Sequence, residues 1–147
     1  MRIGFKGALL AGGLLVALGC GSDSSNQPTG PTISIQNLAF SPADMSVAAG
    51  TTIAIVNNDS MAHTVTSEAA DNDFTPGAVA GVSFDSGQVA AGGGGGTPTP
   101  SNPGPYVEAA TASITIPSSA PSGTVIPYFC QNHKGAMATP NGHITVK

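Results

Sequence analysis

The chain has 147 residues, a formal net charge of −4, and only 8% of its residues are charged. Four Lys and Arg side chains cannot form the basic surface that nucleic-acid binding requires, so the composition excludes that class of function. The length allows one domain once the N-terminal segment is set aside.

Residues 1–19 predict an export signal. Arg2 and Lys6 supply a positive start, and residues 8–18 form an uncharged apolar stretch that is too short to span a bilayer. The stretch ends in small residues before Cys20, which resembles a bacterial lipobox and predicts lipidation of Cys20; the alternative is a plain secretory signal with an incidental cysteine. Removal of residues 1–19 leaves two basic residues against eight acidic ones, a formal charge of −6 that suits basic partners.

Residues 20–31 have the composition of a flexible tether. They are small and polar, include Pro and Gly, and offer nothing to bury. We expect them to hold a folded domain, residues 32–147, a short way off a membrane. The chain is therefore predicted to lie outside the cytoplasm, in the periplasm or at the cell surface, with the lipid on Cys20 as its only membrane contact.

From residue 32 the apolar side chains alternate with polar ones. Ile33 and Ile35 share one face, and a shift of phase near Asn37 predicts a β-bulge. Turn-type residues separate the further strands, which are predicted at 45–47, 51–57, 63–67, 112–116, 124–130 and 142–146. About seven short strands and no helical period predict an all-β protein, a small antiparallel β-sandwich.

Residues 69–107 interrupt this pattern and are predicted to be an insertion. The segment contains five consecutive glycines (92–96) and, in its second half, four prolines (98, 100, 103 and 105), and it is too long for an ordinary connection between strands. We expect residues 91–105 to be a mobile surface loop, and the first half, with Phe74 and Phe84, to dock partly on the domain. The glycines do not lie between a strand and a helix, so a phosphate-binding loop is excluded.

Three soft donors lie close together near the C-terminus. Cys130 ends a predicted strand, His133 follows three residues later, and Met137 follows four residues after that. His63 begins another predicted strand and shares a face with Val65, so we expect it to point inward. Thiolate, imidazole and thioether groups suit copper rather than calcium or magnesium, and this set predicts one copper ion with His63, Cys130 and His133 as equatorial ligands and Met137 as a long axial ligand.

Each of these residues also has an ordinary explanation. His63 alone is typical of a hydrogen-bonded histidine at the core edge, Met137 of a packing residue, and Cys130 of an inert buried thiol. Zinc sites usually have paired cysteines, and a catalytic thiol would need a helix N-terminus or a similar activating group. If Cys20 is lipidated, Cys130 has no disulfide partner, and a lone thiol in an oxidising compartment favours occupation by a metal. His143 is expected to face outward.

At these residues the sequence resembles the cupredoxins, the small blue copper proteins that include plastocyanin, amicyanin and pseudoazurin. The resemblance covers most of residues 32–147, and it is carried by residues 35–42, 58–59, 63–66, 84–87 and 128–130 together with His133 and Met137. It implies a Greek-key β-sandwich with one type 1 copper ion, the same four ligands, and electron exchange at an exposed apolar end beside His133. The spacing from His133 to Met137 lies between those of amicyanin and plastocyanin, and Met61 is the other thioether that could take the axial position.

The expected function is therefore the transport of single electrons by a monomeric protein that is not an enzyme. We expect transient partners outside the cytoplasm, such as c-type cytochromes or a terminal oxidase or reductase. Two alternatives stay open, which are a copper-binding protein for delivery or storage, and a module that acts only as part of a larger oxidase.

Overall fold

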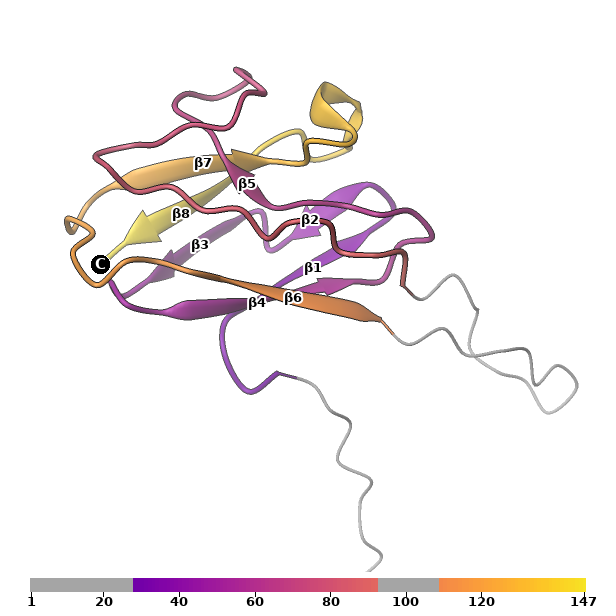
Figure 1. Cartoon of the computed structure of the whole chain (residues 1–147), viewed down its shortest axis with the longest axis horizontal. Helices are drawn as coiled ribbons and strands as arrows, with labels where there is room; N and C mark the ends of the chain where they lie inside the picture. The colour runs from indigo at the N-terminus through magenta and orange to yellow at the C-terminus, as the bar shows by residue number, and fades with distance from the viewer. Residues whose placement is uncertain (1–27, 93–108) are drawn as a thin grey trace, which may run out of the picture.

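The computed structural model describes residues 28–92 and 109–147, whose strands form two four-stranded sheets (Figure 1). The first sheet has the order β2 (Ala39–Ser41), β1 (Thr32–Gln36), β4 (Thr52–Asn57), β6 (Ala110–Thr115). The second has the order β3 (Asp44–Val47), β8 (Gly142–Val146), β7 (Val125–Phe129), β5 (Thr66–Ser67). One 3-10 turn, η1 (Lys134–Ala136), is the only helical element of the described residues, and they contain no helix long and apolar enough to cross a membrane.

The core lies between the two sheets, as the alternation of apolar side chains predicts. Ile33 and Ile35 of β1 and Ile53 and Ile55 of β4 are fully buried, and the residues between them are more exposed. The second sheet contributes Ile126, Tyr128, Ile144 and Val146 from β7 and β8. Inward-facing side chains from two stacked sheets are the defining feature of a β-sandwich, so that prediction is confirmed.

The predicted antiparallel pairing holds for four of the six strand pairs and fails for two. β1 pairs with β4, and β3 with β8, in parallel, whereas the other pairs are antiparallel. Alternation shows which face of a strand is buried, and it has the same period in both directions, so it carries no information on pairing direction. The described residues also contain eight strands rather than about seven, because the segment around Phe40 forms a strand of its own.

The bulge predicted near Asn37 is a hairpin turn. Asn37 and Leu38 both have positive φ, 53° and 58°, and they connect Gln36 to Ala39 in the antiparallel pair β1–β2. Two central residues with positive φ are typical of the tight turns that join twisted strands. The shift of phase in the sequence therefore marks the change from one strand to the next.

Tyr128 and Gly142 fix the two ends of the segment that carries most of the predicted site. They are paired in the β7–β8 ladder, and the Tyr128 hydroxyl donates to the Ala43 carbonyl at 2.9 Å. A Cβ at position 142 would collide with the Tyr128 ring, so the close packing requires glycine here. Burial raises the pKa of the Tyr128 hydroxyl far above its ordinary value. We call residues 130–141, which connect β7 to β8, the ligand loop.

The first half of the predicted insertion folds back on the domain. The ring of Phe74 packs against Phe129 with a centroid separation of 6.0 Å. The expected mobile loop at residues 91–105 lies almost entirely outside the described residues, as do the predicted signal at 1–19, Cys20 and most of the tether.

Candidate metal centre

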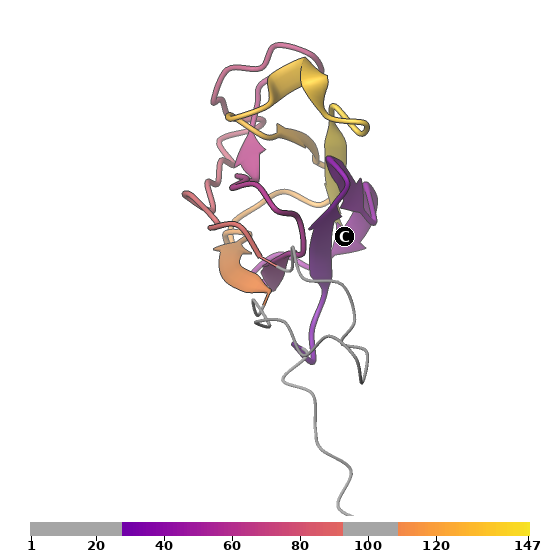
Figure 2. The same cartoon turned by 90° about the vertical axis from the view of Figure 1, so that its right-hand side faces the viewer.

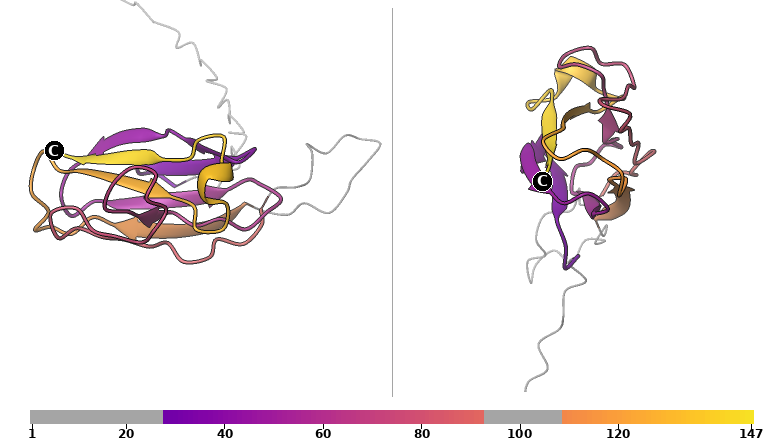
Figure 3. Two further views of the ribbon diagram at one scale, coloured as in Figure 1. Left: turned by 90° about the horizontal axis from the view of Figure 1, so that it is seen from above. Right: turned by 90° about the vertical axis from the view of Figure 1, so that its left-hand side faces the viewer.

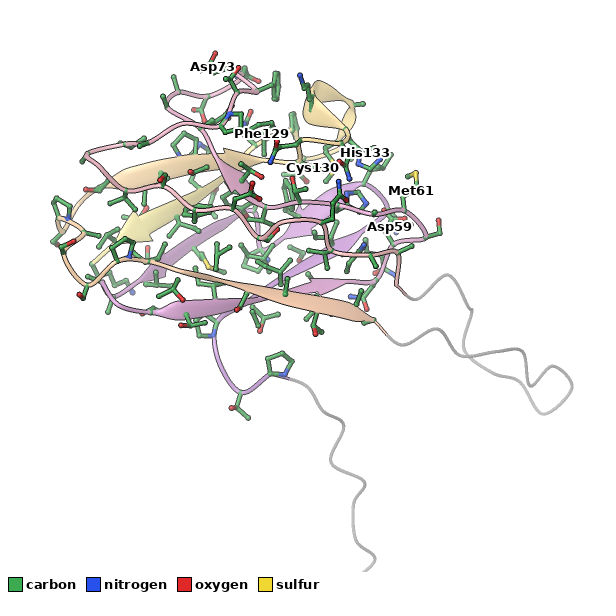
Figure 4. The ribbon with its side chains drawn as sticks, in the orientation of Figure 1. Asp59, Met61, Asp73, Phe129, Cys130 and His133 are labelled. Atoms are coloured by element: carbon green, nitrogen blue, oxygen red, sulfur yellow. The ribbon has the colours of Figure 1, made fainter. Side chains whose placement is uncertain are left out.

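Three predicted ligands meet at one end of the sandwich. Cys130 and His133 lie at the end opposite the C-terminus, with Asp59 and Met61 on the neighbouring loop (Figures 1 and 4). The ligand atoms of His63, Cys130 and His133 all lie within 4.8 Å of one another. The fold therefore brings together residues from two segments that are 67 positions apart in the sequence.

Both imidazole rings present the same nitrogen to the thiol. The Cys130 Sγ atom lies 3.6 Å from His63 Nδ1 and 3.5 Å from His133 Nδ1. The two ring centroids are 4.5 Å apart. His63 and Cys130 are fully buried, whereas His133 is partly exposed. One edge of the site therefore reaches the surface through the His133 ring.

The backbone at the start of the ligand loop places Cys130 and His133. The Lys134 N–H donates to the Cys130 carbonyl at 2.7 Å, and the Ala136 N–H donates to the His133 carbonyl at 2.8 Å. These bonds form the turn that leads into η1. The Thr64 N–H lies 3.4 Å from Cys130 Sγ and points a donor at the sulfur. A hydrogen bond of this kind favours the thiolate over the neutral thiol.

Asp59 sets the orientation of the His63 ring. Its Oδ2 atom lies 3.3 Å from His63 Nε2 and also accepts the Leu38 N–H at 2.8 Å. With the Nε2 proton held by this carboxylate, His63 Nδ1 has a free lone pair that faces Cys130. Burial and then the charge of His133 lower the pKa of His63, and the opposing effect of Asp59 does not restore it. The neutral ring, the form that binds metals, is therefore favoured near pH 7.

Asp59 itself is held as a carboxylate. Burial alone would raise its pKa, but the N–H groups of Leu38 and Ser60 and the His63 side chain outweigh burial and lower it. The Asn57 side chain, also fully buried, accepts the Asp59 N–H at 2.9 Å and donates to the Met61 and Ala90 carbonyls. The loop before His63 is therefore fixed from inside the domain.

A second polar network supports the residue after Cys130. The Gln131 N–H donates to Thr64 Oγ1 at 2.9 Å, and the Gln131 side chain donates to Thr66 Oγ1 and to Asp85 Oδ2, each at 3.0 Å. On the exposed side, the Asn132 amide donates to the Ala62 carbonyl at 2.8 Å. These bonds join the ligand loop to the segment that carries His63.

The two methionines near the site differ in burial. Met137 is 4% exposed and follows η1, where its N–H donates to the Lys134 carbonyl at 3.3 Å. The next residue, Ala138, donates its N–H to the Leu38 carbonyl at 2.7 Å. Met61 is 41% exposed, and its sulfur points away from the domain (Figure 4). Burial on the ligand loop favours Met137 over Met61 as a thioether donor.

This arrangement fits a soft transition metal. One thiol sulfur and two imidazole nitrogens converge, and the described residues contain no other group of three His, Cys, Asp or Glu side chains that converge in this way. A His₂Cys set is the donor set of mononuclear copper electron-transfer sites. His143, predicted to face outward, lies on the surface away from the site and contacts Asp44 and Asp71.

Sequence reasoning missed the residues that orient the ligands. Asp59 stands four positions before His63, but this spacing within an irregular loop gives no indication that the two side chains meet. Asn57, Thr64 and Gln131 are ordinary polar residues in the sequence. Their importance comes from burial and from their partners, which only the structure provides.

Comparison with known proteins agrees with this site. A family described as copper binding proteins, plastocyanin/azurin family, matches residues 30–147. No curated protein matches the chain.

Several solved structures are similar to this chain at low sequence identity. An oxidized proline-to-glycine mutant of amicyanin is 15% identical, with 84% of this chain and 88% of that chain covered and a TM-score of 0.50. Amicyanin from Paracoccus versutus is 16% identical, with 83% and 86% covered and a TM-score of 0.49. A purple cupredoxin from Nitrosopumilus maritimus is 17% identical, with 80% and 99% covered and a TM-score of 0.49. At this identity, the likeness to the amicyanin mutant shows a common fold.

Replacement of the Asp59 carboxylate is expected to weaken metal binding. In Asp59→Asn, the His63 Nε2 proton loses a charged acceptor, and affinity for Cu(II) should fall by about 10- to 100-fold. Competition with a chelator of known affinity measures this change. Asp73→Asn, an equally conservative change at an exposed position, is the control. Equal affinities for Asp59→Asn and the control would show that Asp59 does not orient a ligand.

Proposed function

This chain belongs to the plastocyanin/azurin family of copper-binding proteins, and from that premise we propose that it carries single electrons between redox partners. The proposed ligands are His63, Cys130 and His133, with Met137 in the axial position. One bound copper ion would supply the electron transfer by alternating between Cu(I) and Cu(II). The protein has no substrate in this proposal and makes no bonds.

The observation that carries the proposal is the convergence of Cys130 Sγ with the Nδ1 atoms of two histidines. Soft ligands that are held by a packed β-sandwich can keep nearly one geometry in both oxidation states of a metal. Here Asn57, Asp59 and Gln131 hold the segments that carry the ligands. The Thr64 N–H at the sulfur withdraws electron density from the thiolate and so contributes to the reduction potential.

We propose that electrons enter and leave through His133, since it is the partly exposed member of the three proposed ligands. Ala136, whose N–H donates to the His133 carbonyl, is exposed and uncharged, and the exposed Lys134 between them is basic. A contact surface with few charges allows brief docking, while the acidic remainder of the chain attracts basic partners from a distance. Partners of this chemistry include c-type cytochromes and terminal oxidases or reductases, and the carrier acts as a monomer.

The sharpest test of the proposal is optical. Cu(II) added to the purified protein should give an intense blue absorption from thiolate-to-copper charge transfer, because Cys130 supplies the sulfur. Cys130→Ser should remove this absorption while the fold, measured by circular dichroism, is retained. A colourless Cu(II) complex of the native chain would contradict electron transport and favour copper delivery or storage.

The axial position is tested by the reduction potential. Met137→Leu removes the thioether, and the potential should rise while the blue colour remains, because a weak donor that favours Cu(II) is lost. Cyclic voltammetry of the copper-loaded protein measures the change, with Met61→Leu as the matched control. A shift in Met61→Leu and none in Met137→Leu would transfer the axial role to Met61.

We propose that the mature protein is held at a membrane outside the cytoplasm by a lipid on Cys20. The predicted signal at residues 1–19 and the small residues before Cys20 support this proposal. Cys20→Ser in the full chain should move the protein from the membrane fraction to the soluble fraction of the expressing bacterium. An unchanged distribution would show that Cys20 is not the anchor.

A further inference from the structure

The loop of residues 68–77, here called the brace loop, is closed at its base. The Gly77 N–H donates to the Ser67 carbonyl at 2.9 Å, and the Ser67 hydroxyl donates to the Gly77 carbonyl at 2.7 Å. The Glu68 N–H donates to the Pro127 carbonyl of β7 at 3.0 Å. These bonds attach the brace loop to the edge of the second sheet, so its tip projects from a fixed support.

The brace loop lies beside the ligand loop in every view (Figures 1, 2 and 3). The Phe74 ring packs edge-on against Phe129, the residue before Cys130. It also covers Gly135 in η1, where an added Cβ would lie 3.3 Å from the ring. Phe74 therefore contacts the last residue of β7, directly before the ligand loop, and the loop itself between His133 and Met137.

Glu68 contacts the far end of the ligand loop. Its Oε1 atom accepts a hydrogen bond from the Asn141 side-chain amide, which stands just before β8. Its Oε2 atom accepts the Phe74 N–H at 2.6 Å. One carboxylate thus joins Phe74, which packs on η1, to Asn141, which ends the ligand loop.

Glu68 and Phe74 both occupy unfavourable states. Glu68 is fully buried, and burial raises its pKa although the bonds from backbone N–H groups oppose this change. Phe74 has a φ of 51°, a left-handed conformation that is costly for an aromatic residue. A buried carboxyl group or a strained backbone is retained only where surrounding contacts fix it, and such features are concentrated at functional sites. Here both features lie in the contact between the brace loop and the ligand loop.

We propose that Glu68 is a positioning residue for the metal site, which acts through Phe74 and Asn141 to hold the ligand loop in its binding geometry before any metal arrives. The proposal rests on the proposed function, because the ligand loop needs a fixed geometry only if it binds a metal ion. It assigns a role to the first part of the insertion. Its consequence is a ligand loop that is ordered without metal and changes little between oxidation states.

The first experiment uses the metal-free protein. Amide hydrogen exchange is measured at Lys134, Ala136 and Met137, whose N–H groups bond within the ligand loop. In Phe74→Ala, exchange at these amides should be about tenfold faster, because the loop opens without global unfolding. Exchange in β4, on the other sheet, should not change.

The control is Asp73→Asn, whose side chain points away from the domain at the tip of the same loop (Figure 4). The ligand-loop amides of this variant should exchange at the same rate as those of the native protein. Unchanged exchange of the ligand loop in Phe74→Ala would overturn the proposal, and so would an equal acceleration in β4, since the contact would then support the whole fold rather than the loop.

A reciprocal exchange of side chains tests Glu68 itself. Glu68→Gln places an amide N–H against a donor, and Asn141→Asp places two carboxylates together, so each single variant should accelerate exchange in the ligand loop. The double variant Glu68→Gln with Asn141→Asp restores a donor and an acceptor in reversed positions and should recover most of the native protection. If amides of the ligand loop exchange as fast in the double variant as in the single variants, the proposed role of this hydrogen bond is overturned.

The copper-loaded variants give an independent readout. Phe74→Ala should bind Cu(II) and become coloured, but with an altered absorption spectrum and reduction potential, whereas Asp73→Asn should match the native protein. A native spectrum and potential in Phe74→Ala would contradict the positioning role. Failure of the native chain to become blue would end the proposed electron transport but would leave the exchange result in the metal-free protein unaffected.

Discussion

The pairing of β5 with β7 is the contact on which the site depends. Thr66 pairs with Phe129 and Ser67 with Tyr128, and this register brings the segment that begins at His63 beside the end of β7, which leads directly into Cys130. A slip of one residue would turn each side chain to the opposite face and separate the sulfur from the imidazole. Only two residues of β5 form this ladder, so other contacts must maintain the register.

Those contacts are polar and mostly buried. The His63 backbone pairs with Val89, Thr64 accepts the Gln131 N–H, and Asn57 fixes the loop before His63. The buried side-chain polar atoms of the described residues all have hydrogen-bond partners. A satisfied buried network favours one arrangement, because each alternative leaves a polar group without a partner. Precision at the ligands is therefore a property of the polar groups around them, while the apolar core supplies the stability.

The fold could be predicted from the sequence as far as periodicity carries information. Alternation at Ile33, Ile35, Ile53 and Ile55 identified the buried faces, and hence the sandwich. It could not identify the parallel pairs, because a strand has the same period in both directions. In the sequence, the turn at Asn37 resembles a bulge for a related reason: both features shift the phase of alternation, and only the pairing partner distinguishes them.

The residues of the metal site likewise fall into two groups, those that the sequence can predict and those that it cannot. Cys130 and His133 could be predicted as a pair since they are close in sequence. His63 is buried as expected, but the strand predicted at 63–67 is only Thr66–Ser67 in the structure, and all residues from 63 to 68 are buried, so strand phase does not account for its inward position. Asp59, Glu68 and Asn141 act through contacts between segments, which have no local pattern.

The central claim is that His63, Cys130 and His133 bind one copper ion. X-ray absorption at the copper edge of the copper-loaded protein tests this claim most directly. One short copper–sulfur distance with two nitrogen neighbours, the sulfur absent in Cys130→Ser, is the predicted result; a shell of oxygen and nitrogen alone in the native protein would contradict it.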